Sequence, residues 1–152
     1  MLAALMSALH VLTLALGLGA VVARGRALRA VARGDSAAVR RVLFADGLWG
    51  LAAILWLSTG LTRVLGGLDK SLDFYLYNGF FWTKMALFVL VLALEIWPMV
   101  TFIRWRIALG GGAVPDTRAA ALLVRVNHAE TALVVLIPFV AAAMARGLWL
   151  VS

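Results

Sequence analysis

Residues 80–103 read FFWTKMALFVLVLALEIWPMVTFI, and this apolar stretch decides the fold. About 20 residues of helix cross the hydrocarbon core of a bilayer, which is about 30 Å thick, so the stretch predicts a transmembrane helix. Two charged side chains interrupt it, Lys84 and Glu95, and their spacing of about three turns places both on one face. Because an isolated charge in hydrocarbon costs at least about 2.5–3.5 kcal/mol, this face should look into a bundle. Both residues are therefore candidates for a functional site.

Three further stretches of similar character cover residues 2–23, 44–64 and 125–148. The chain has 152 residues, of which 64% are hydrophobic and 14% charged, whereas about 25% are charged in soluble domains. We therefore expect an all-α, polytopic membrane four-helix bundle that forms a single domain over residues 1–152. The first stretch has no basic segment before it and no A-x-A site before Arg24, so we expect a permanent span rather than a signal peptide.

Arginines set the predicted orientation. Between the first two spans lie Arg24, Arg26, Arg29, Arg33, Arg40 and Arg41, and Arg104, Arg106 and Arg118 follow the third, whereas the second connection is acidic to neutral. The positive-inside rule then places both termini on the periplasmic or exterior side of the membrane. The net charge of +7 is explained by this topology, so we expect the lipid bilayer and no nucleic acid as a partner. Asp35-Ser36 and Pro115-Asp116-Thr117 predict helix N-caps beyond the membrane.

Helical rise converts sequence position into depth and sorts the polar residues into two layers. His10 and Lys84 fall in an outer layer. The inner layer contains Asp46, Trp49, Glu95, Asn127, His128 and Glu130. Two interpretations of this inner layer stay open: a hydrogen-bond cluster in which Glu95 or Glu130 pairs with Arg125, and a proton relay or carboxylate-binding site.

His10 and His128 are the two histidines of the chain. Neutral imidazole is a common axial ligand of haem iron, so His10 is either a haem ligand or a histidine that packs against a neighbouring helix. His128 is a possible second ligand, but the two histidines differ by about 15 Å in predicted depth, whereas the axial ligands of one iron lie nearly level. Without cysteine, two separated histidines leave too few ligands for a zinc or copper site.

The whole chain resembles an uncharacterised bacterial family of small predicted membrane proteins. The matching segments are Leu9-His10-Val11-Leu12, Asp46-Gly47-Leu48-Trp49-Gly50, Phe81-Trp82-Thr83-Lys84, Pro98 with Trp105-Arg106, and Met144-Ala145-Arg146-Gly147. More distantly, the layout is similar to the four-helix membrane protoporphyrinogen oxidases of the HemJ type and their copper-resistance-like relatives.

Three features carry the second resemblance: His10 with Arg26 sixteen residues later, Trp82 and Lys84 in place of Trp-x-x-Lys, and Asn127 to Thr131 in place of Asn-Glu-x-Pro-Thr. His128 replaces that glutamate and Glu130 replaces that proline. The resemblance implies haem b on His10, with Lys84 near it as the partner of a propionate or porphyrin carboxylate.

The first functional hypothesis is a bacterial inner-membrane b-type haem protein, with an oxidoreductase related to protoporphyrinogen oxidation as its enzymatic form. Its cofactor-binding residues would be His10, Arg26, Lys84, Arg125 and Asn127, and its catalytic residues Lys84, Glu95, His128 and Glu130. The second hypothesis is a non-enzymatic accessory or scaffold subunit of a larger membrane complex. The third is metal or small-cation transport with water-filled access to Lys84 and Glu95. Stripes of small residues allow a homo-oligomer, and analogy with the HemJ type suggests a trimer.

Overall fold

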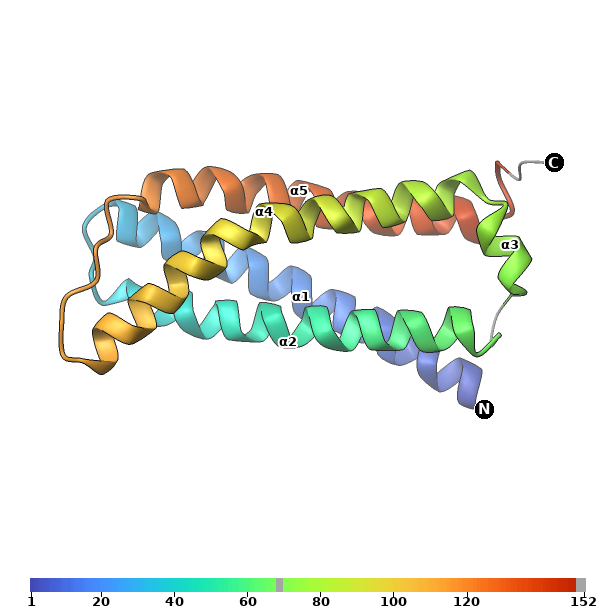
Figure 1. Cartoon of the computed structure of the whole chain (residues 1–152), viewed down its shortest axis with the longest axis horizontal. Helices are drawn as coiled ribbons and strands as arrows, with labels where there is room; N and C mark the ends of the chain where they lie inside the picture. Colours follow the sequence, from blue (N-terminus) through green and yellow to red (C-terminus); the bar gives the residue numbers. More distant parts are fainter. Residues whose placement is uncertain (68–69, 150–152) are drawn as a thin grey trace.

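The computed structural model describes residues 1–67 and 70–149. Its long helices are α1 (Leu2–Ala32), α2 (Ala38–Leu65), α4 (Gly79–Gly110) and α5 (Ala120–Ala145), and the short helix α3 (Leu72–Leu76) lies between α2 and α4 (Figure 1). All four long helices are apolar and long enough to span a membrane. The prediction of an all-helical chain with four membrane-length helices is confirmed.

All four long helices extend beyond the predicted spans at the end of the bundle that carries the α1–α2 connection. α1 continues past Arg24 because Ala27, Leu28 and Val31 are buried there against α2, α4 and α5 residues such as Val39, Phe102 and Leu123. In contrast, α5 stops at Ala145 and not at residue 148, because Gly147 adopts a positive φ of 71°.

The caps explain where the helices begin. The N-cap residue of α2 is Ala37, so the N-cap predicted at Asp35-Ser36 is wrong by one or two residues, although Asp35 Oδ1 accepts from the Ala38 amide at 3.2 Å. Asn78, which the sequence did not single out, accepts from the amides of Phe80 and Phe81 and donates to the carbonyl of Leu148 at 3.1 Å. The N-cap residue of α5 is Ala119, so the N-cap predicted at Pro115-Asp116-Thr117 is wrong. The Asp116 carboxylate instead binds the exposed guanidinium of Arg118 at 2.7 Å, and the Thr117 carbonyl accepts from the Ala120 amide.

α1 packs against both α2 and α5, α4 packs against α5, and α2 and α4 touch at few points. Figure 1 shows the start of α1 and the end of α5 at the same end of the bundle, as an even number of crossings requires, and which side of a membrane that end faces stays a prediction. α4 contains Pro98 and changes direction along its length, so that its second half crosses toward α2. The small residues of α1 permit close approach: a Cβ on Gly17 would lie 3.4 Å from Ala52 and from Trp49.

Candidate functional sites

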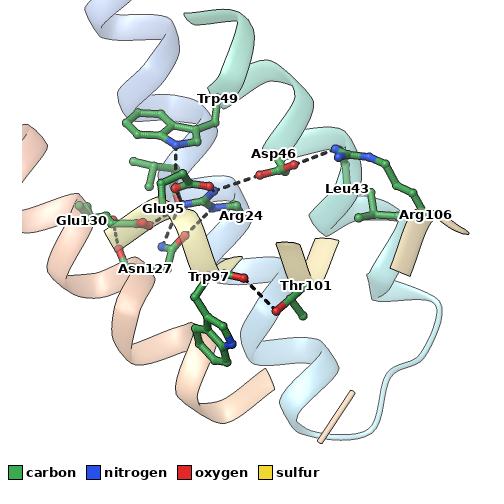
Figure 2. Close-up of polar contacts among 12 residues, drawn as sticks. Arg24, Leu43, Asp46, Trp49, Glu95, Trp97, Thr101, Arg106, Asn127 and Glu130 are labelled. Carbon is green, nitrogen blue, oxygen red and sulfur yellow. Dashed lines mark hydrogen bonds and ion pairs between the residues drawn. The ribbon is translucent and has the colours of Figure 1, made fainter. Parts of the chain in front are cut away.

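Arg24 lies at the centre of a buried polar cluster that takes side chains from all four long helices (Figure 2). Its Nε donates to Asn127 Oδ1 at 2.8 Å, and Nη1 donates to Asp46 at 3.1 Å and to Glu95 at 2.7 Å. Nη2 donates to Glu95 at 3.0 Å and to Glu130 at 2.5 Å. A guanidinium has five N–H donors, so these five bonds use all of them. We call Arg24, Asp46, Glu95, Asn127 and Glu130 the Arg24 cluster.

Neighbouring residues hold this geometry in place. Trp49 Nε1 donates to Glu95 Oε2 at 3.0 Å, and Asn127 Nδ2 donates to the carbonyl of Val21 at 3.1 Å. The Arg24 guanidinium also lies 5.8 Å from the ring centroid of Trp49, within the range of a cation–π contact. Gly25 makes room for the amide, since a Cβ there would lie 2.6 Å from Asn127 Nδ2.

Arg106 connects the Arg24 cluster to the surface of the bundle. Its Nη2 donates to Asp46 Oδ2 at 2.7 Å and to the carbonyl of Leu43 at 3.1 Å, while its side chain remains 43% exposed. Asp46 therefore bridges two guanidinium groups, one buried and one accessible. The cluster thus reaches from the interior of the bundle to an accessible side chain.

The second site is a pocket between α1, α2 and α4, which we call the His10 pocket. Compared with the Arg24 cluster, it lies nearer the end of the bundle at which α1 begins. Its cavity volume is about 110 Å³, and it is lined by His10, Trp56, Leu57, Gly60, Leu61, Val64, Phe81, Lys84, Met85 and Phe88. The imidazole stacks on Trp56 with ring centroids 5.5 Å apart. The Lys84 ammonium lies 5.3 Å from the ring centroid of Phe81. His10 and Lys84 therefore share one pocket, as their predicted depths indicated.

The structure does not bring the remaining predicted residues into these sites. Arg125 is exposed, so the predicted pairing of Glu95 or Glu130 with Arg125 is wrong. Both carboxylates instead form ion pairs with Arg24. Arg26 is exposed and lines a groove between α1 and α2 about 24 Å of helical rise from His10.

His128 lies outside both sites. It is exposed, and its Nε2 lies 2.9 Å from Nη1 of Arg29. Arg29 is nineteen residues from His10 on α1, about 28 Å of helical rise, so the two histidines do not face one cofactor.

Sequence reasoning missed Arg24, which it treated as a topology signal at the end of the first span. A signal for its burial was nevertheless present. Gly17, Ala20, Arg24, Leu28 and Val31 follow the spacing of one helix face, and all five are buried. The apolar face of α1 thus continues through Arg24, which marks the arginine as an interior residue.

Four membrane-length helices around a buried ion-pair cluster define a polytopic helical membrane protein. The chain belongs to the family described as Predicted membrane protein (DUF2214), which matches residues 2–148. Neither the curated proteins nor the solved structures contain a match to the chain. The family match supports the resemblance to a family of predicted membrane proteins, while the resemblance to protoporphyrinogen oxidases is carried by the short motifs alone.

Proposed function

We propose that this protein binds haem b in the His10 pocket and acts as a membrane oxidoreductase of one-electron or porphyrin chemistry. The observation that carries the proposal is the hydrogen bond between His10 Nδ1 and Thr59 Oγ1, 2.8 Å long. In the proposed arrangement Nδ1 donates in this bond, which leaves the lone pair on Nε2. Bound haem would supply the electron transfer, while the protein would set its orientation and surroundings.

The hydroxyl of Thr59 is the group that orients His10 in this proposal. Its oxygen lies 2.8 Å from the carbonyl of Leu55 and 3.1 Å from that of Trp56, so its single proton has acceptors on its own helix. In the proposed arrangement Thr59 donates to these carbonyls and accepts from His10, which places the hydrogen on Nδ1 and the lone pair on Nε2. Histidines that bind metals have this arrangement, with the other ring N–H donated to an oxygen that orients the ring.

Lys84 supplies the second chemical group that a haem or porphyrin carboxylate needs. It is half-buried in the same pocket as His10 and forms no salt bridge with a described residue, so its charge is uncompensated. The buried Nε1 of Trp56 likewise donates to no described residue. A carboxylate ligand would satisfy the ammonium, and the indole N–H of Trp56, whose residue lines the same pocket, is a further donor.

The residues that line the pocket suit a porphyrin chemically, but the cavity is too small to hold one without a change in the structure. Gly60 leaves space against the histidine, because a Cβ there would lie 3.1 Å from His10 Cε1, and Met85 adds a thioether to the lining. The cavity of about 110 Å³ is smaller than the roughly 300–1,000 Å³ of typical ligand sites, so a porphyrin requires the pocket to widen. α2 and α4 form opposite walls and touch at few points, so they are the elements that would separate.

The test is a reduced-minus-oxidised absorption spectrum of the purified protein expressed with a supply of haem. We expect a haem b signal that His10→Ala abolishes and that His128→Ala leaves unchanged, because the latter histidine is exposed outside the pocket. Thr59→Ala should lower haem affinity by about 10–100-fold, as is typical when the partner that orients a ligating histidine is removed. A colourless wild type, or a signal that survives His10→Ala, would contradict the proposal and favour the scaffold hypothesis.

A further inference from the structure

The Arg24 cluster, taken together with the bound Arg106, contains more acidic groups than basic ones. From α1 comes Arg24, from α2 Asp46, from α4 Glu95 with Arg106, and from α5 Glu130 beside the neutral Asn127. With every group ionised, two guanidinium groups face three carboxylates, which leaves one negative charge without compensation. Burying an uncompensated charge in a low-dielectric interior is costly, and one proton would make the cluster neutral.

Glu130 is the carboxyl group whose surroundings fit that proton best. Each oxygen of Asp46 accepts from a guanidinium, and the two oxygens of Glu95 together accept three hydrogen bonds. Glu130 is fully buried and binds Arg24 through Oε2, but its Oε1 has no partner among the described residues. As a carboxylate, Glu130 would therefore bury an oxygen that no described residue satisfies.

We propose that the Arg24 cluster is a proton-binding site in which Glu130 takes up and releases one proton. On uptake, the proton forms an O–H bond with a Glu130 carboxyl oxygen and the cluster becomes neutral. On release, that bond breaks and the carboxylate remains bonded to Nη2 of Arg24. No other bond changes, so the site needs no further reactant.

One cavity borders the other two carboxylates of the cluster, Asp46 and Glu95, although Glu130 does not itself line it. This cavity of about 160 Å³ is bordered by Asp46, Trp49 and Glu95 at one end and by Trp56 and Phe88 at the other. Trp56 and Phe88 also line the His10 pocket, so these rings form the boundary between the two spaces. A cavity of this size has room for water, and carboxylates on its wall offer that water partners. The proton site thus lies between an accessible guanidinium, Arg106, and the His10 pocket.

The inference stands independently of haem binding, and its test uses protein prepared without added haem. Infrared difference spectra of the full chain in lipid nanodiscs, recorded between pH steps, detect the C=O band of a protonated carboxyl group and its shift in deuterated water. We expect a titrating band that Glu130→Gln removes and that Asp116→Asn, on an exposed residue, leaves in place.

A second variant keeps the proposal testable if Glu130→Gln does not fold. Arg106→Gln removes a partly exposed positive charge from the cluster, so the band should titrate at a pH higher by about one unit, a roughly tenfold gain in proton affinity. The proposal is wrong if the wild type and Glu130→Gln give the same spectra. It is also overturned if Arg106→Gln leaves the titration unmoved, or if Glu95→Gln removes the band while Glu130→Gln retains it.

Discussion

Replacing Arg24 with leucine tests how much of the fold depends on one guanidinium. The substitution removes five hydrogen bonds and leaves the carboxylates of Asp46, Glu95 and Glu130 close together. Hydrogen bonds to charged groups contribute about 1.5–3 kcal/mol each, but their sum overstates the loss, because the stranded carboxylates can bind protons or water. Removal of one partner from a buried ion pair typically costs about 3–5 kcal/mol. Since a helix unfolded within the membrane also finds new polar partners, we expect about 3 kcal/mol.

The assay is unfolding in mixed micelles of mild detergent with increasing dodecyl sulfate, followed by tryptophan fluorescence and circular dichroism. Arg24→Lys should lose less than Arg24→Leu, because it keeps the charge but cannot reproduce the planar fork of donors. Arg41→Leu is the matched control: it breaks the exposed ion pair with Asp35 and should leave the transition unchanged. The reasoning fails if Arg24→Leu unfolds within 1 kcal/mol of the wild type, an order-of-magnitude threshold set by the cost of breaking a buried pair.

Three further predictions address the remaining features. Gly25→Ala should destabilise the protein by about 1–3 kcal/mol in the same assay, because its Cβ would displace the bonded amide of Asn127, whereas Gly19→Ala meets nothing within 4 Å and should be neutral or stabilising. Lys84→Leu should raise the melting temperature, because it removes a charge that costs about 2.5–3.5 kcal/mol in hydrocarbon, and it should abolish haem retention. If the lysine had a structural role instead, the substitution would lower the melting temperature. The guanidinium bonded to Asp116 lowers the pKa of that carboxyl group from 3.8 to about 2. Its stabilisation is therefore complete above pH 3.8 and lost as the pH falls through about 2, so acid unfolding of the wild type and Asp116→Asn should differ at pH 5 and converge below pH 2.

The sequence predicted the helices well because hydropathy over a membrane-length window is a strong signal. Depth was predictable for the same reason: helical rise is fixed, so His10 and Lys84 fell in one layer and are found in one pocket. The rotation of each helix was not predictable from depth. Asn127, Glu130, Val134 and Ile137 form the buried face of α5, and His128, one residue and about 100° further round, is exposed.

Arg24 escaped prediction because a hydropathy window treats the first arginine after an apolar stretch as the end of the span. Acceptors on three other helices stabilise the buried guanidinium, and the sequence of α1 alone does not indicate them. The same argument applies to Asp46, whose second partner comes from Arg106 at the far end of α4. Charge networks of this kind depend on tertiary structure. The sequence therefore shows which charged residues are present but not which of them pair.

The two polar sites differ in how completely their charges are satisfied, and this difference separates structure from function. Every N–H of Arg24 has an acceptor, so the Arg24 cluster could persist as a fastening between helices even without another role. Lys84 has no such compensation among the described residues, since its contacts are the face of Phe81 and an apolar pocket wall. An unpaired ammonium in hydrocarbon is costly, and the carboxylate ligand proposed above would offset that cost. For this reason the His10 pocket, rather than the better ordered Arg24 cluster, is the place where a ligand carboxylate is expected.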